Sequence, residues 1–228
     1  MVPLLLWWAR LNQREAQATS LLAIAPAALI GVGSYALGGV APLLPALLVA
    51  LGATAGAQLG AFLLRKLSLE WLRWTFIVFV AAMAITVIFT LPDRQAQISL
   101  GLPEVSILIS IGIVMGTAAG LFGIGGGIIA IPLIMLILGA GDLEAKGVSL
   151  IAMVPAALSG SLSHLRHKTA SLRNGAWVAV GALITTPLGA LGAFSLPESF
   201  ANVVFGAFGL TIALILTLRA IRIQKSGD

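Results

Sequence analysis

The sequence contains no cysteine and very few charged residues. None of its 228 residues is cysteine, and only 9% are Asp, Glu, Lys or Arg. The absence of cysteine excludes disulfide bonds, thiolate metal sites and persulfide chemistry. The shortage of charge excludes an ordinary soluble domain, in which about a quarter of the residues are charged. With 59% apolar residues and a mean hydropathy of +1.08, the chain is expected to be an all-α polytopic membrane protein.

The sequence also lacks the motifs of the common enzyme classes. It has no carboxylate or histidine pair inside an apolar run, and its glycine-rich segment is not followed by the Lys-Ser/Thr pair of a nucleotide-binding loop. The formal net charge of +5 does not indicate a nucleic-acid partner, because the basic residues lie at the ends of the apolar runs. We therefore expect no catalytic activity, no cofactor, no metal site and no nucleic-acid partner.

Long uncharged runs predict the membrane spans. A helix needs about 20 apolar residues to cross a bilayer, and glycine and proline divide the longest run into two. The predicted spans are 17–36, 43–64, 73–91, 147–164, 174–195 and 199–219.

The run from 105 to 141 differs from the others because Gly123, Gly125, Gly126 and Gly127 interrupt it. A continuous helix is unfavourable there. We expect a broken, re-entrant hairpin whose helices have about 18 and about 12 residues, the second covering only ~18 Å. Irregular backbone at membrane depth is tolerated only where protein or water lines it. A polar ligand is therefore expected to visit the turn.

The basic residues predict the topology. Eleven of the 13 lie in alternate loops, which the positive-inside rule assigns to the cytoplasm together with the C-terminus. Only Arg94 and Lys146 fall on the other side. This alternation requires the 105–139 segment to enter and leave the membrane on the same, outer, side.

The chain contains an internal repeat. Shifted by 129 residues, the segment 16–31 matches 145–160 at nine of 16 positions, including Ser20 with Ser149 and Pro26 with Pro155. The loop charges place the two copies in opposite orientations. We expect two inverted repeats, each a glycine-broken hairpin plus three transmembrane helices: a first repeat at 1–91, an external linker at 92–104 and a second repeat at 105–228. From the register of the repeat we expect the first helix of the first hairpin to be absent from the printed sequence, with Met1 an internal methionine.

Two segments resemble a known family. Residues 123–133, GIGGGIIAIPL, and 145–150, AKGVSL, resemble the duplicated signature of the sulfite exporter TauE/SafE family, of which the first half keeps Pro3, Ala16, Ser20 and Pro26. The resemblance implies a multi-pass transporter of the bacterial inner membrane that exports small sulfur oxyanions or organosulfonates. Its partners would be the anionic substrate and the lipid bilayer.

The glycine cluster is the predicted substrate site. Where glycines break a helix, free backbone N–H groups and the positive end of the next half-helix can hold an oxyanion. We expect Gly123, Gly125, Gly126 and Gly127 to bind the substrate, with the hydroxyls of Ser149 and Ser20 as further donors. Close helix packing through small residues is the competing interpretation. It is the preferred one for the regularly spaced glycines 52, 56 and 60 and 112, 116 and 120.

Several other residues have two interpretations. Pro132, Pro26 and Pro155 are either hinges or simple helix kinks. Gln58 and Thr185 either line the substrate path or make interhelical hydrogen bonds. His164 and His167 belong either to a proton or anion funnel or to the basic residues that anchor the cytoplasmic end.

The function expected from these patterns is secondary transport by alternating access, with the substrate held near the midplane between inverted repeats. Two alternatives remain: a transporter of another small anion, and a truncated membrane subunit that does not transport. The two ridges of regularly spaced glycines, 52, 56 and 60 and 112, 116 and 120, would also permit a homodimer.

Overall fold

The computed structural model describes residues 1–89, 98, 100–195 and 198–225, and every regular element in these ranges is an α-helix. The helices are α1 (Val2–Trp7), α2 (Gln13–Leu37), α3 (Leu43–Lys66), α4 (Leu69–Phe89), α5 (Leu102–Phe122), α6 (Gly127–Leu138), α7 (Asp142–Arg166), α8 (Leu172–Ser195) and α9 (Glu198–Lys225). Judged on the described residues, five of them are long and apolar enough to cross a membrane: α2, α3, α5, α7 and the Leu172–Gly192 part of α8. Helices α4 and α9 lie at the predicted spans 73–91 and 199–219 but are not among these five, whereas α5, expected as half of a hairpin, is. The prediction of an all-α polytopic membrane protein is confirmed. Most of the predicted linker at 92–104 lies outside the described residues.

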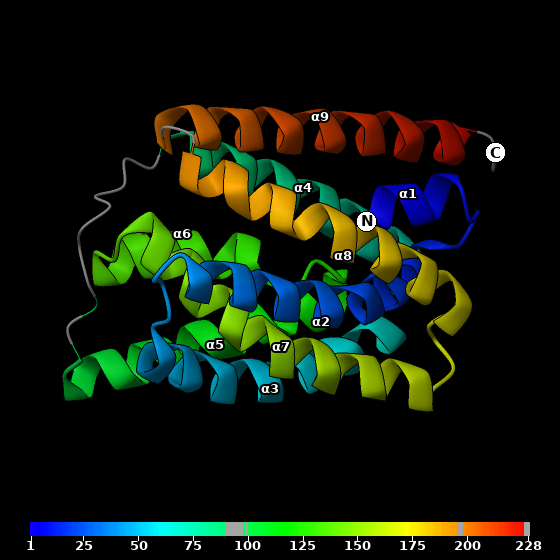
Figure 1. The fold of residues 1–228 in the computed structure, drawn as a ribbon. Coiled ribbons are helices and arrows are strands. Elements are labelled where there is room, and N and C mark those ends of the chain that lie inside the picture. The colour runs from blue at the N-terminus through cyan, green and yellow to red at the C-terminus, as the bar shows by residue number, and fades with distance from the viewer. Residues whose placement is uncertain (90–97, 99, 196–197, 226–228) are drawn as a thin grey trace.

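The interrupted run folds as a broken helix pair. Its first helix, α5, has 21 residues and its second, α6, has 12, so the predicted lengths of about 18 and about 12 are nearly correct. The break falls at Gly123–Gly126, as the glycines predicted. Figure 1 shows α6 as the short helix beside the longer ones.

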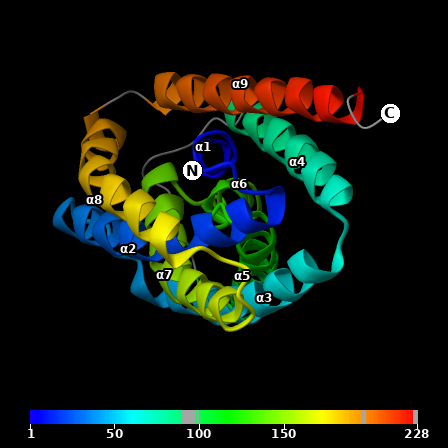
Figure 2. The same ribbon diagram turned by 90° about the vertical axis from the view of Figure 1, so that its right-hand side faces the viewer.

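Helix bounds repeat along the chain. The bounds of α2 and α3, moved by 129 residues, coincide with those of α7 and α8. The contacts repeat as well, because α3 packs on α7 and α8 packs on α2. Helices α4 and α9 pair at one edge of the bundle, with α3 and α5 at the opposite edge (Figures 1 and 2). The central pair is α2 with α7.

The tightest packing joins α3 to α5, and glycine makes it possible. A side chain at Gly56 of α3 would collide with the backbone carbonyl of Ile113 in α5, and one at Gly116 would collide with Ala53 in return. The other glycines of both ridges meet backbone in the same way. The predicted packing role of the two glycine ridges is therefore confirmed.

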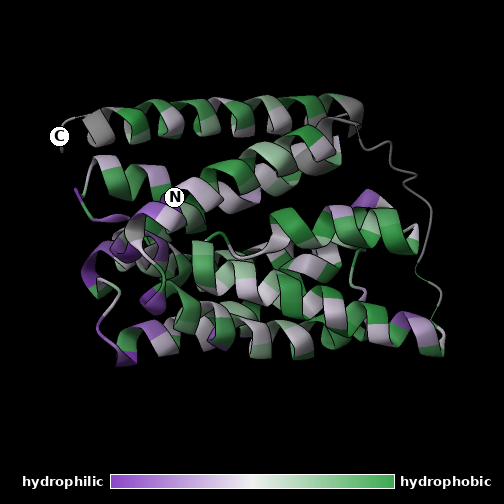
Figure 3. Cartoon of the chain, turned by 180° about the vertical axis from the view of Figure 1, so that it is seen from behind, coloured by the Kyte–Doolittle hydropathy of each residue, from purple (hydrophilic) through white to green (hydrophobic). Residues whose placement is uncertain are grey.

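One end of the bundle is strongly hydrophilic, as Figure 3 shows. Here a guanidinium N–H of Arg14 donates to the carbonyl of Leu67 over 2.8 Å, and Arg65 donates to the hydroxyl of Ser163 over 3.2 Å. We call this the basic end. At the start of α7 Lys146 instead pairs with the buried Asp142, with 2.7 Å between Nζ and Oδ2.

Candidate functional site

The backbone of the glycine turn explains its composition. Three of its residues adopt positive φ angles: +64° at Gly123, +76° at Gly125 and +77° at Gly126. Side chains strongly disfavour this left-handed region, so only glycine fits without strain. Gly123 ends α5 and Gly126 is the N-cap of α6.

The turn leaves backbone donors free. The N–H of Gly123 still bonds to the carbonyl of Ala119 over 2.9 Å, and the next backbone bond runs from Ile129 to Gly126 over 3.0 Å. Between them, the N–H groups of 124–128 have no hydrogen-bond partner among the described residues. They lie at the N-terminal end of α6, where the helix dipole is positive. Free donors and a positive dipole together suit an anion.

Helices α2 and α7 enclose the turn. Gly123 stands directly against the backbone of Gln17 in α2. A Cβ placed on Gly127 would lie 4.0 Å from the Cβ of Ser149 in α7, and one on Gly125 would lie 2.7 Å from the sulfur of Met153. Any side chain at these positions would collide with α2 or α7. Glycine therefore allows the two central helices to pack directly against the turn.

The two predicted serines flank the turn from opposite helices. Both are 1% exposed. The hydroxyl of Ser149 is buried without a hydrogen-bond partner in the described part of the chain. Ser20 lines an interior cavity of about 270 Å³ together with Gly123. The structure thus places Ser149 beside Gly127 and places Ser20 in the cavity that Gly123 also lines.

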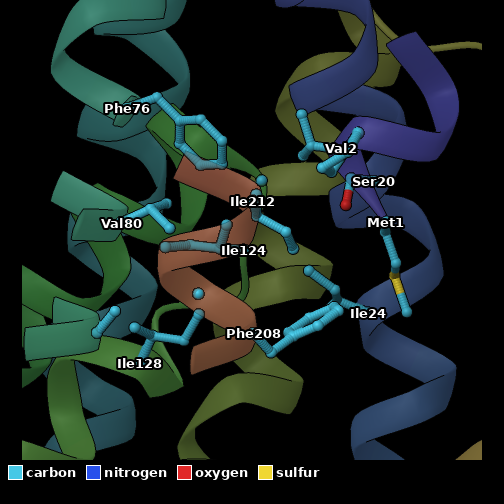
Figure 4. Close-up of a pocket in the computed structure, with 14 residues that line it drawn as sticks. Met1, Val2, Ser20, Ile24, Phe76, Val80, Ile124, Ile128, Phe208 and Ile212 are labelled. Carbon is cyan, nitrogen blue, oxygen red and sulfur yellow. The ribbon is translucent and has the colours of Figure 1, made fainter. Parts of the chain in front are cut away.

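The rest of this cavity is apolar. Figure 4 shows Ser20 among Met1, Val2 and Ile24, with Phe76 and Val80 of α4 on the other side. The residues Gly123, Ile124 and Ile128 of the turn and of the start of α6 thus form one wall of a largely apolar cavity, in which the Ser20 hydroxyl is the one polar side-chain group of the described lining.

Sequence reasoning missed Gln17. This side chain is fully buried, and neither atom of its amide has a hydrogen-bond partner among the residues described here. It lies three residues before Ser20, so the two share one face of α2. An amide in an apolar span, one turn from a predicted donor, was the signal that could have identified it.

The secondary candidates lie away from the turn or inside helices. Pro132 of α6, Pro26 of α2 and Pro155 of α7 are all within helices, so both of their interpretations stay open. Gln58 donates from its amide to the carbonyl and hydroxyl of Ser159, over 2.9 and 2.8 Å. The hydroxyl of Thr185 donates to the carbonyl of Gly181 in its own helix, over 3.0 Å. A role for Gln58 and Thr185 in the substrate path stays a prediction.

The described residues include no group of three or more His, Cys, Asp or Glu side chains that could hold a metal ion. The polar groups that the structure places around the turn are backbone N–H groups, two serine hydroxyls and the Gln17 amide, all of which act through hydrogen bonds.

Comparison with known proteins places the chain in a family. A family model described as sulfite exporter TauE/SafE matches residues 1–87 and 108–227. The chain is 30% identical over 121 residues to a probable membrane transporter protein, YunE, of Bacillus subtilis. The aligned residues make up 50% of this chain and 44% of the relative. A probable membrane transporter protein of Xylella fastidiosa is also 30% identical, over 49% of the chain and 43% of the relative. The chain thus matches less than half the length of these relatives, and no solved structure matches. The family match covers most of the sequence, and the protein belongs to the sulfite exporter TauE/SafE family of membrane proteins.

Proposed function

We propose that this membrane transporter exports small sulfur oxyanions or organosulfonates across the bacterial inner membrane. The observation that carries the proposal is the glycine turn, where free N–H groups at the start of α6 adjoin the unpartnered hydroxyl of Ser149. Sulfite and sulfonates present several acceptor oxygens on one small group, and these donors match them. The family and the names of the relatives support transport rather than catalysis.

The same geometry favours release. No lysine or arginine is among the residues that line the interior cavity or meet the turn glycines in the described chain. An anion held by neutral donors alone binds less tightly than one paired with a buried cation. A transporter needs this balance, because each substrate must leave the site that it enters.

Alternating access is the proposed mechanism. The turn is enclosed by α2 and α7, which are repeat partners in sequence and in helix bounds. In secondary transporters built from inverted repeats, the substrate lies at the interface of the two copies. Rocking of one repeat against the other would open the turn first to the basic end, assigned to the cytoplasm by its charge, and then to the opposite side.

Sulfite efflux from proteoliposomes tests the proposal. The wild type should release internal sulfite, and Gly126→Leu should stop release because the added side chain would meet the backbone of Met115 and strain a left-handed residue. Gly33→Leu is the matched control, because no atom lies within 4 Å of a Cβ at Gly33. It should transport like the wild type.

A second variant separates transport from folding. Ser149→Ala removes a buried hydroxyl that has no partner in the described structure, so the fold should tolerate it. Its efflux rate should nevertheless fall about tenfold, the effect of losing a hydrogen bond worth about 1.4 kcal/mol in the transport cycle. If well-folded wild-type protein moves no sulfite or sulfonate, the substrate assignment is wrong. If Ser149→Ala transports normally, the turn is not the binding site.

A further inference from the structure

A second cavity opens at the basic end of the bundle. It has a volume of about 410 Å³ and is separate from the interior cavity beside the turn. Its lining residues come from the start of α2, the end of α3 and the segment after α7. They are Asn12, Arg14, Glu15, Arg65, His167, Lys168 and Thr169.

The positive charge in this cavity exceeds the negative charge, because Arg14, Arg65 and Lys168 face a single carboxylate, Glu15. Arg14 is held by the carbonyl of Leu67 and Arg65 by the hydroxyl of Ser163, both neutral acceptors. Neither guanidinium forms a salt bridge within the described ranges. The one carboxylate of the lining, Glu15, accepts the backbone N–H of Asn12 over 3.2 Å in a capping box. The cavity therefore presents fixed cations whose charge is available to a ligand.

Lys168 lines the cavity and has a backbone conformation that is rare for a residue with a side chain. Its φ angle is +54°, in the left-handed region that favours glycine. A side chain here carries a conformational cost of about 1 kcal/mol. The residue ends the turn after α7, where its N–H donates to the carbonyl of Leu165 over 3.0 Å. A glycine would make this turn without strain but would remove a cation from the cavity wall.

A row of polar residues leads from this cavity to the glycine turn. Arg14, Gln17 and Ser20 follow one another at three-residue intervals on α2, about 4.5 Å apart along the helix axis. Arg14 lines the basic cavity, Gln17 adjoins Gly123, and Ser20 lines the interior cavity. The Nε of Arg14 and the whole amide of Gln17 are buried without partners in the described chain.

Helix α7 supplies the facing side of this row. Leu21 of α2 lies against Gly160, and α2 and α7 run in opposite directions, so the residues before Leu21 face those after Gly160. Ser161 and His164 occupy these positions. The hydroxyl of Ser161 and the Nδ1 of His164 are both buried and have no partner among described residues. Buried polar atoms without protein partners on two facing helices leave hydrogen-bonding capacity between them for water or a polar solute.

We propose that the basic cavity is a capture site, in which Arg14, Arg65 and Lys168 concentrate small oxyanions before they pass along Gln17 to the glycine turn. The proposal rests on the proposed function and adds a first binding step to it. Guanidinium groups match the paired oxygens of sulfite and sulfonates, and a cavity of one charge sign raises the local anion concentration. The phosphate of a lipid headgroup presents the same oxygens, so the experiment has to distinguish the two sources.

The test compares charge removal inside and outside the cavity. Arg65→Gln keeps a hydrogen-bond donor for Ser163 but removes the charge, whereas Arg173→Gln removes a charge from an exposed residue at the start of α8 that does not line the cavity. Initial sulfite efflux rates are measured against sulfite concentration at low salt. Arg65→Gln should raise KM about tenfold and leave kcat within about twofold, because charge steers and concentrates the anion rather than moving it. Arg173→Gln should change neither.

Salt and lipid composition supply the remaining readouts. The KM difference between wild type and Arg65→Gln should shrink at about 1 M salt, where charges are screened within about 3 Å. Adding phosphatidylglycerol to phosphatidylcholine vesicles should leave the wild-type KM unchanged. A wild-type KM that rises with phosphatidylglycerol, with no rise in Arg65→Gln, would show a lipid phosphate in the cavity and overturn the proposal. An unchanged KM in Arg65→Gln would overturn it too.

Direct binding separates this inference from the proposed function. If no preparation moves sulfite, the proposed function fails, and equilibrium dialysis of labelled sulfite against purified wild type and Arg65→Gln still decides the capture site. Weaker binding in the variant, with Arg173→Gln unchanged, supports the site. Equal binding in all three proteins refutes it.

Discussion

The imidazole of His164 donates a hydrogen bond from Nε2 to the backbone carbonyl of Gly120 over 3.1 Å, inside the bundle. The donor is assigned because a carbonyl oxygen only accepts, so Nε2 carries the hydrogen of this bond. Gly120 lies in the last turn of α5, where carbonyls lack partners within the helix. A side chain of α7 therefore caps the broken end of α5, three residues before the glycine turn, and links the position of the turn to that of α7.

Replacing His164 by leucine should destabilise the protein. The carbonyl of Gly120 would then be buried without a donor, at a cost of about 1–3 kcal/mol. The free energy of unfolding, or the thermal midpoint in detergent, measures the effect. His167→Leu is the control, because that ring is bonded to a carbonyl of its own helix and is exposed. Equal losses in the two variants would mean that the cap of α5 does not hold the turn in place.

The repeat partners α3 and α8 should respond differently when one of their glycines is replaced by leucine. Gly56→Leu places a side chain against the backbone of α5, where it has no room, so α3 and α5 must separate. Gly181 lies on α8, and nothing lies within 4 Å of a Cβ there. Gly56→Leu should therefore lower stability by more than about 3 kcal/mol, as overpacking against rigid backbone does at its upper end. Gly181→Leu should change stability by less than about 0.5 kcal/mol. A comparable loss in Gly181→Leu would show that α8 is packed on that face.

The start of α2 should depend on its capping box. Asn12 accepts the N–H of Glu15 over 2.9 Å, and Glu15 accepts the N–H of Asn12 in return. Asn12→Ala should lower stability by about 0.5–2 kcal/mol. The double variant Asn12→Ala/Glu15→Ala should be only slightly less stable than Asn12→Ala alone, because each single change already disrupts the same pair of reciprocal hydrogen bonds. Fully additive losses, measured by chemical unfolding, would indicate two independent caps.

The sequence was sufficient to predict the long helices and the break, but not the short helix α1. Charge-free runs and glycine positions predicted α2, α3, α7 and α8 as spans, because backbone hydrogen bonds inside a bilayer have to be satisfied within the helix. Helix α5 was expected only as half of a hairpin, yet it is itself long and apolar enough to cross a membrane. Four glycines between residues 123 and 127 predicted the break because glycine is unfavourable inside a helix, and three of them do adopt left-handed conformations. The packing role of Gly52, Gly56 and Gly60 followed from their four-residue spacing.

The basic cavity and Gln17 could not be predicted in the same way. Arg14 and Arg65 are 51 positions apart, and the positive-inside rule explains both without any cavity. Only the packing of α2 and α3 at one end brings them to a common surface. Whether the Gln17 amide finds a hydrogen-bond partner depends on the side chains that pack around it. This is a property of the tertiary structure and cannot be inferred from the spacing of residues in the sequence.

Gln17 gives the sharpest test of the route between the two cavities. Its amide is buried with no hydrogen-bond partner in the described chain, so it weakens the fold by the free energy of desolvating its polar atoms. Gln17→Met keeps the length of the side chain and removes this penalty, so it should raise the free energy of unfolding by about 1 kcal/mol.

The same variant should slow sulfite efflux about tenfold, because removing a group that hydrogen-bonds the moving anion gives up about 1.4 kcal/mol. A gain in stability together with a loss of transport is the expected signature of a residue kept for its ligand, since a purely structural residue would lose stability when replaced. Leu21→Met is the matched control, because Leu21 is equally buried but apolar, and its efflux should stay within about twofold of the wild type. If Gln17→Met unfolds more easily than the wild type, the amide has a structural partner and the route does not pass along α2.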